Sequence, residues 1–144
     1  MREDRIHKIE VHVGCICFDK EKVLILKRSE ERKLFPGVWE CGGGQVWTGE
    51  GFEEAVQRQL LEEAGISVNI VCPVAIYQID VSGDEQRKIP GMYFACTFEG
   101  YEYGDRPKLS REHTEWKWVT LEELEDYDLI PGLEEQIKKA YSCL

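Results

Sequence analysis

The chain has 144 residues, which suits a single domain over 1–144 and leaves little room for a second. Apolar residues make up 42% of it, enough to build a core, so a wholly disordered protein is excluded. Asp and Glu outnumber Lys and Arg by 28 to 18, and the net charge is −10. Such a chain is not expected to bind nucleic acid. Its surplus carboxylates suit a hard cation, or they form an acidic surface with no further role.

The sequence also bears on location. Charges interrupt every apolar run well before it reaches a membrane-spanning length, and the polar segment 1–10 has no signal-peptide core. The six cysteines form no Cys-x-x-Cys pair and have no zinc-type spacing with the histidines. We therefore expect a cytoplasmic protein with reduced thiols and without a membrane partner, and we leave a homodimer open.

Three segments in the first part of the chain are apolar and β-branched, which predicts strands. They cover residues 9–18, 23–26 and 38–40. A polar turn at 19–21 joins the first two as a hairpin. The charged segment 27–33 and the turn at Pro36-Gly37 lead to the third, which runs into the glycines 42–44.

Residues 52–64 predict a helix, because Phe52, Val56 and Leu60 recur every four residues and Gly65 marks the C-terminal end. The remaining elements are predicted from the same kinds of pattern. They are strands at 68–81, 92–98 and 116–119, a polar loop at 100–111, a capping box of Thr120 and Glu123, and a helix at 133–141. This mixture predicts an α+β fold, specifically an α/β/α sandwich with a mixed sheet.

The first predicted helix carries the residues that say most about function. Gln59, Glu62 and Glu63 share one face of it, since they are three and four residues apart. That face borders the apolar stripe, so its carboxylates should be partly buried and would repel each other unless a positive charge lies among them. Arg58 and a divalent cation are the two candidates, and the preceding glycines would let a phosphate or a metal approach the backbone. The alternative is a solvated acidic helix face after an ordinary turn.

The defined residues of this region occur at fixed spacings. They are Gly44, Glu50, Arg58, Gln59, Leu60, Glu62, Glu63, Gly65 and Ile66. The run resembles the Nudix box, Gly-x5-Glu-x7-Arg-Glu-apolar-x-Glu-Glu-x-Gly-apolar, at every defined position but one. Pro36-Gly37-x-Trp39 and the segment 118–124 extend the resemblance over most of the chain. It implies an α/β/α sandwich that hydrolyses a nucleoside diphosphate linked to another group.

The resemblance also implies a metal site. In the family the box helix presents its glutamates to Mg²⁺ or Mn²⁺, a chemistry that needs hard oxygen ligands and an open coordination position. Glu62 and Glu63 are thereby expected to be catalytic residues and metal ligands. The carbonyl of Gly43 or Gly44 is expected to complete the site, and these glycines are expected to approach the substrate.

Two further acids are implied by the same comparison. Glu50 is expected either near the metal or as the partner of Arg58, which would itself orient the ligand carboxylates. Glu112 lies in the loop before the last strand, where several family members have an additional metal ligand or the catalytic base. Glu115 is the rival in that loop, and the alternative for both is an exposed glutamate.

Gln59 is the one departure from the box pattern. Its amide oxygen can approach a cation, but the side chain has no charge and cannot accept a proton. Three interpretations stay open: a catalytic variant whose base lies elsewhere, such as Glu112; a weakened domain that binds nucleotide and metal only; or an engineered Glu-to-Gln replacement. The retained Arg58, Glu62 and Glu63 favour a working enzyme.

The sequence says least about the substrate. Arg28, with Arg32 and Lys33, precedes the glycines and is predicted to meet phosphate, although a solvated basic loop is the alternative. Four aromatic residues are candidates for stacking on a base or for the core: Trp39, Trp47, Tyr77 and Tyr93. The run Ser-Gln-Pro-Trp-Pro-Phe-Pro of NADH-cleaving relatives is missing. The compact length most resembles MutT-like nucleoside triphosphate hydrolases, and a nucleotide is the expected small-molecule partner.

Overall fold

The computed structural model describes residues 9–144. Residues 1–8, most of the segment considered above for a signal peptide, lie outside this range. The elements in chain order are β1 (His12–Asp19), β2 (Lys22–Arg28), β3 (Trp39–Glu40), β4 (Gly42–Gln45), α1 (Phe52–Ala64), β5 (Ile66–Asp80), β6 (Lys88–Tyr101), β7 (His113–Val119), the 3-10 helix η2 (Glu122–Asp126) and α2 (Leu133–Tyr141). No helix among the described residues is long and apolar enough to cross a membrane.

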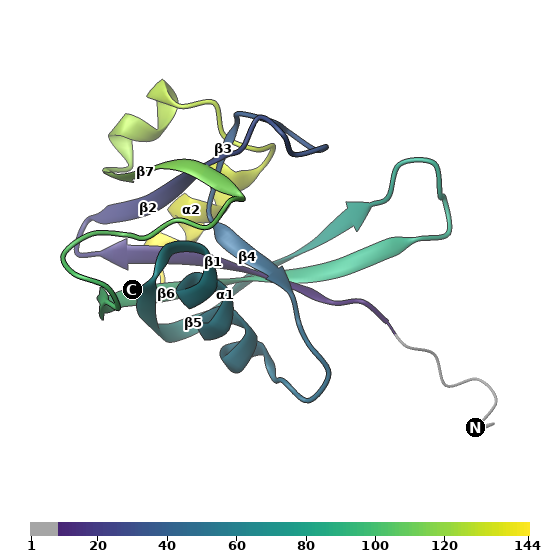
Figure 1. Ribbon diagram of the computed structural model, residues 1–144, viewed down its shortest axis with the longest axis horizontal. Helices are drawn as coiled ribbons and strands as arrows, with labels where there is room; N and C mark the ends of the chain where they lie inside the picture. Colours follow the sequence, from purple (N-terminus) through teal and green to yellow (C-terminus); the bar gives the residue numbers. More distant parts are fainter. Residues whose placement is uncertain (1–8) are drawn as a thin grey trace.

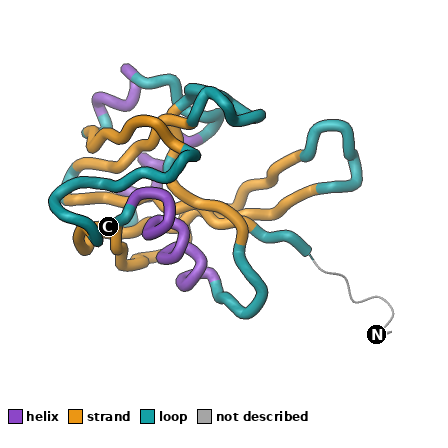
Figure 2. The backbone as a smooth tube through the Cα atoms, viewed as in Figure 1, coloured by secondary structure: helices purple, strands orange, loops and turns teal. Residues whose placement is uncertain are grey.

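All the strands join in one mixed sheet between two helices (Figure 1). Its main order is β3-β2-β1-β6-β5, with β4 added on β1 and β7 on β2. The β1–β6 pair is parallel and the other strand pairs are antiparallel. Helix α1 covers one face and α2 the other, as the helices in Figure 2 show, so a separate core lies on each side of the sheet. The predicted α/β/α sandwich is confirmed.

Both predicted helices have the bounds that the sequence indicates. Val56 and Leu60 of the predicted stripe are fully buried against the sheet, as their spacing requires, whereas Phe52 in the first turn is 43% exposed. Gly65 ends α1 in the left-handed conformation, φ 63°, which glycine adopts without a steric penalty. The predicted capping box is present too, since the Thr120 amide donates to Glu123 Oε1 at 3.0 Å.

Several strands extend beyond their predicted ends. β6 runs from Lys88 to Tyr101 rather than over 92–98, because β5 pairs with it along almost its whole length in a hairpin that projects from the body (Figure 1). β2 includes Lys27 and Arg28, which were predicted to lie in a loop. They pair with Glu115 and His113 of β7, and this pairing also starts β7 before the predicted position 116. Partner strands supplied hydrogen bonds that local apolar patterns do not reveal.

The glycine segment before α1 is a strand, which the sequence analysis did not predict. Gly42–Gln45 forms β4 and pairs with His12–Cys15 of β1. Gly43 has φ 155°, and a Cβ there would overlap the carbonyl oxygen of Val13, so only glycine fits this close approach. The strand brings its backbone alongside α1, where the site is built.

Candidate active site

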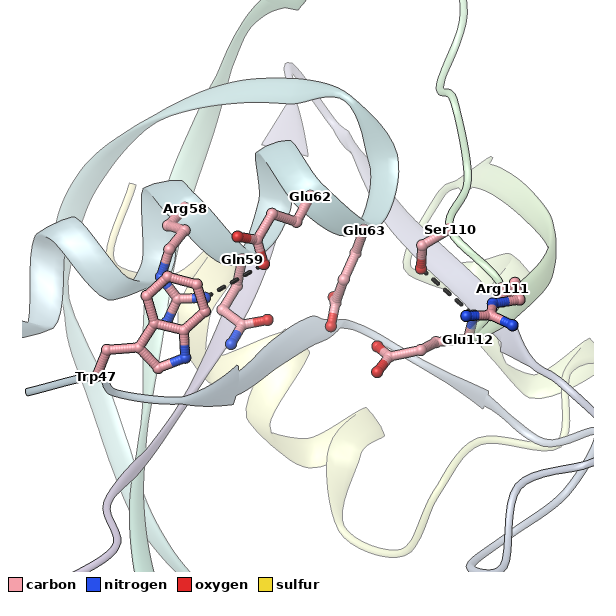
Figure 3. Close-up of a pocket in the computed structure, with 8 residues that line it drawn as sticks. All are labelled: Trp47, Arg58, Gln59, Glu62, Glu63, Ser110, Arg111 and Glu112. Atoms are coloured by element: carbon pink, nitrogen blue, oxygen red, sulfur yellow. Dashed lines mark hydrogen bonds and ion pairs between the residues drawn. The ribbon is translucent and has the colours of Figure 1, made fainter.

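A cavity of about 310 Å³ lies between α1 and the segments on either side of it (Figure 3). Its lining comes from the loop before α1, from α1 itself and from the loop before β7. The lining residues are Trp47, Arg58, Gln59, Glu62, Glu63, Ser110, Arg111 and Glu112. The structure thus brings together all five side chains predicted as catalytic.

The β6–β7 loop is fastened to the C-terminal end of α1. Ser110 donates its amide to the Glu63 carbonyl at 3.0 Å, one of the helix-end carbonyls that lack a helical partner. On the other side, the Ser29 amide donates to the Glu112 carbonyl at 2.9 Å. These two bonds hold Glu112 beside the box helix, although Glu112 and Glu63 are 49 positions apart in the sequence.

Glu63 is the most deeply buried acid of the cavity, with 4% of its surface exposed. Its Oε2 accepts the Gly43 amide at 3.0 Å, and its carboxylate faces that of Glu112 (Figure 3). Burial is the main reason that the pKa of Glu63 lies well above its usual value. The hydrogen bond from the Gly43 amide lowers that pKa, and the negative charge of Glu112 raises it further. Two facing carboxylates, Glu63 buried and Glu112 exposed, call for a positive charge between them.

Arg58 does not supply that charge, because its guanidinium is engaged elsewhere. Its Nε and Nη2 donate to Glu50 at 2.6 and 2.9 Å, and Nη2 also donates to the Gln45 carbonyl at 2.8 Å. Glu62, with a half-exposed side chain, accepts from Nη1 at 3.3 Å. The hydrogen bonds between Glu50 and Arg58 lower the pKa of Glu50 and raise the pKa of Arg58. Of the two roles considered for Glu50, the structure shows the second: it fixes Arg58.

Gln59 takes the position that the box spacing predicts, on the cavity face of α1 next to Glu63 (Figure 3). It is 9% exposed, and its Nε2 donates to the Gln45 carbonyl at 3.2 Å. A Cβ at Gly44 would lie 2.6 Å from Nε2, so glycine there makes room for the amide. With Nε2 bound to the backbone, the amide oxygen is the atom left to meet a cation.

The donor set fits a hard divalent cation. Within residues 9–144 no three His, Cys, Asp or Glu side chains are grouped closely enough to form a complete metal site. The cavity instead offers the facing carboxylates of Glu63 and Glu112, the Gln59 amide oxygen and, from the helix surface, Glu62. Mg²⁺ takes one or two carboxylates together with substrate phosphate and water, so a partial protein ligand set suits it. Burial chiefly raises the pKa of Glu63 and the Glu112 charge adds to it, and a cation bound between the two carboxylates would oppose both effects.

Comparison with known proteins agrees with this geometry. Residues 8–141 match the NUDIX domain. The chain belongs to this family. The nucleoside triphosphatase NudI of Escherichia coli O17:K52:H18 is 31% identical over 111 residues, covering 74% of this chain and 78% of that protein. The predicted enzyme class, a Nudix hydrolase acting on phosphoric anhydrides, is confirmed at the level of the family.

Solved structures show the same fold. The E. coli ORF135 protein superposes with a TM-score of 0.72 at 27% identity, covering 94% of this chain and 90% of that one. The MutT NUDIX hydrolase from Burkholderia pseudomallei gives a TM-score of 0.74 at 20% identity, with 92% and 98% covered. The second likeness concerns the fold alone.

Arg28 lies outside this Nudix cavity. It is buried, and it donates from Nη1 to Glu40 at 2.8 Å and from Nε to the Leu34 carbonyl at 2.9 Å. Arg32 and His113 reach the other oxygen of Glu40, at 3.1 and 2.7 Å. Burial pushes the pKa of Glu40 up, but the His113 hydrogen bond and the two arginines outweigh it and hold that pKa low. The placement does not support the predicted contact of Arg28 with phosphate.

Most of the other candidates also fall outside the cavity. Glu115 pairs with Lys27 at 3.2 Å on the β2–β7 ladder, so Glu112 rather than its rival reaches Glu63. Trp39 is buried, and Tyr77 and Tyr93 stack at 4.5 Å, with pKa values that burial raises. Trp39 belongs to the packed interior, whereas Tyr77 and Tyr93 are half-buried and Tyr77 lines a separate cavity with other residues of β5 and β6.

Trp47 is the stacking candidate that lines the cavity, with 53% of its surface exposed. The sequence analysis missed Ser110 and Arg111, because it assigned residues 100–111 to a polar loop without a role. Arg111 directly precedes Glu112 in the sequence. A positively charged side chain next to a predicted metal ligand could have identified Arg111 as a candidate.

Proposed function

We propose that this Nudix domain is a pyrophosphohydrolase dependent on Mg²⁺ or Mn²⁺. Its substrate is a nucleoside diphosphate linked to another group, in the first place a nucleoside triphosphate, and it releases a nucleoside monophosphate. The observation that carries the proposal is the pair Glu63 and Glu112, which face each other across a cavity beside the box helix. The similarity to a nucleoside triphosphatase supports the choice of substrate.

The residues divide the work of hydrolysis between them. A bound divalent cation would offset the charge of the diphosphate and lower the pKa of a coordinated water. Glu63, held by the Gly43 amide, and Glu62 are the proposed carboxylate ligands. The Arg58–Glu50 pair keeps the helix and the β4 backbone in register around them. This arrangement leaves the cavity open for the phosphates.

Glu112 is the proposed general base. Gln59 cannot accept a proton, whereas the exposed carboxylate of Glu112 can take one from the attacking water. The water oxygen bonds to one of the two phosphorus atoms joined by the α–β bridge, the bond from that phosphorus to the bridging oxygen breaks, and the leaving group keeps the electron pair on that oxygen. From a nucleoside triphosphate the products are the nucleoside monophosphate and pyrophosphate. A cytoplasmic location and action on free nucleotides, rather than on nucleic acid or at a membrane, belong to the same proposal.

Gln59 favours one second candidate, a module that binds nucleotide and metal without turnover. The neutral amide removes one charge from the cation site, and a carboxylate binds a hard cation better than an amide does. Calorimetry on this module would show nucleotide binding, and no product would form on long incubation.

A substrate panel tests both candidates. It contains nucleoside triphosphates and their oxidised and deoxy forms, ADP-ribose, nucleotide sugars and dinucleoside polyphosphates, each with Mg²⁺, with Mn²⁺ and with chelator. Metal-dependent release of a nucleoside monophosphate is the expected result. Binding without turnover of any compound would overturn the enzyme and leave the binding module.

A further inference from the structure

Trp47 is fixed in place and yet not buried. Its amide donates to Glu50 Oε1 at 2.8 Å, and its carbonyl accepts the Glu50 amide at 3.1 Å. The Arg58 guanidinium lies 3.5 Å from the centre of its ring. With both backbone and ring held, an indole that is 53% exposed loses little further freedom when a ligand stacks on it.

The cation under the ring is itself immobile. Arg58 is bonded to Glu50, Glu62 and the Gln45 carbonyl, so the indole rests on a guanidinium that has no freedom to follow a ligand. Arg58 occupies one face of the ring, and the other face is available. An exposed aromatic face of this kind accepts a nucleobase by stacking, most strongly the larger purine rings.

Arg111 lies at the other end of the cavity, with Gln59, Glu63 and Glu112 between it and Trp47 (Figure 3). It is exposed, and it makes no ion pair with any residue in the described part of the chain. Arg58, the other cation of the lining, is committed to Glu50. A free guanidinium beside carboxylates that would hold a cation is suited to a phosphate oxygen.

We propose that Trp47 and Arg111 define the two ends of a substrate site, with a purine base stacked on Trp47 and the distal phosphate bound by Arg111. The diphosphate then lies over the row formed by Gln59, Glu63 and Glu112. Trp47 determines which base is preferred, and Arg111 determines how strongly binding depends on the number of phosphates. This inference rests on the proposed function in taking a nucleotide as the ligand.

Binding of non-hydrolysable ligands to Trp47→Leu tests the base subsite. The probes are the α,β-methylene analogues of ATP and CTP and inorganic tripolyphosphate, titrated with Mg²⁺ in a calorimeter. The ATP analogue should bind about 5- to 100-fold more weakly to Trp47→Leu, the CTP analogue should lose less, and tripolyphosphate should be unaffected. Trp47→Phe should recover most of the affinity.

Tyr103→Leu is the matched control, since Tyr103 is also exposed and packs on a cation, Lys108 at 4.8 Å, but does not line the cavity. It should change none of the three affinities. Equal weakening of nucleotide and tripolyphosphate by Trp47→Leu would mean that the indole only supports Arg58, and it would overturn the base subsite. Unchanged binding of all three probes to Trp47→Leu would also overturn the base subsite.

Arg111→Gln tests the other end with the same method. The unmodified protein should bind the ATP analogue more tightly than AMP, and Arg111→Gln should reduce that preference about tenfold while leaving AMP binding unchanged. Arg106→Gln is the control, an exposed cation on the same loop that pairs with Asp105 at 3.3 Å and lies outside the cavity. An equal effect of both variants would show a general loss of positive charge and would overturn the role of Arg111.

The binding assay separates this inference from the proposed function, because its probes are not cleaved. Trp47-dependent purine binding without turnover of any substrate would reject the hydrolase and keep the base subsite. Turnover that is insensitive to Trp47 and Arg111 would keep the hydrolase and reject the subsite.

Discussion

Two buried glutamates on neighbouring parts of the fold experience opposite electrostatics. Glu40 is surrounded by Arg28, Arg32 and His113, and its pKa is lowered despite burial. Glu63 has one backbone amide as a donor and faces another carboxylate, and its pKa is raised. Both side chains are largely shielded from water, and burial raises the pKa of both carboxyls. At Glu40 the positive partners outweigh burial, whereas at Glu63 the single amide donor does not.

Under the proposed function, the difference is that between a structural charge at Glu40 and a ligand-binding charge at Glu63. In the Glu40 cluster the negative charge of the carboxylate is compensated by its own partners, and the cluster joins β2, β3 and β7. The Glu63 site has an unbalanced negative charge, which costs stability unless a ligand supplies a cation. Substitutions at the two positions should therefore affect different properties.

The largest effect is expected for Glu63→Gln. Removing this proposed ligand should lower kcat by at least about 10³-fold, since a positioned divalent cation contributes several kcal/mol to the transition state. The melting temperature of the metal-free protein should not fall, because the variant removes a poorly compensated buried charge. Steady-state kinetics and calorimetric melting measure the two. Glu53→Gln, an exposed acid on the same helix, should change neither.

The next effect concerns the proton acceptor. Glu112→Gln should lower kcat under saturating Mg²⁺ by about 10²–10⁴-fold, the usual contribution of a positioned general base. Gln59→Glu should strengthen metal binding and raise kcat only slightly if Glu112 is the base. A rise in kcat of about 10²–10⁴-fold in Gln59→Glu would move the missing base to position 59.

Glu40→Gln is expected to have the opposite effects to Glu63→Gln, lowering stability and leaving the cavity's function intact. Removing one partner of a buried ion cluster typically costs about 3–5 kcal/mol, so the free energy of unfolding should fall by that order. Metal affinity at the cavity should be retained in the fraction that stays folded. Urea denaturation measures the free energy of unfolding. An unchanged denaturation midpoint would contradict the prediction, because it would show that Arg28, Arg32 and His113 are satisfied equally well by water.

A smaller effect is expected from acid. The folded-state pKa of Glu40 lies below its usual value of 4.5, so the stability that this group contributes is present above about pH 4.5 and is lost as the pH falls through the folded-state pKa. Urea denaturation at a series of acidic pH values should show a steeper loss in the unmodified protein than in Glu40→Gln. Parallel curves for the two proteins would contradict the lowered pKa.

The cavity and the Glu40 cluster also differ in how far the sequence could predict them. The positions of Arg58, Gln59, Glu62 and Glu63 on one helix follow from local spacing, because a helix repeats within a few residues. The local sequence does not distinguish Glu112, which lines the cavity, from Glu115, which does not. Nor does it distinguish Arg111, which lines the cavity, from Arg28, which belongs to the Glu40 cluster. Those outcomes depend on which segments pair across the sheet.

The two helices and the box face could be predicted from the amino-acid sequence, since they depend on periodicity, capping and residue type over short stretches. The class of chemistry followed from the resemblance of the box residues to the Nudix pattern. The strand at glycines 42–44, the approach of Glu112 to Glu63 and the cavity shared by Trp47 and Arg111 became visible only in the folded chain. The reason is physical. Strand pairing and loop anchoring depend on hydrogen-bond partners far away in the sequence, and no local pattern specifies which partner is used.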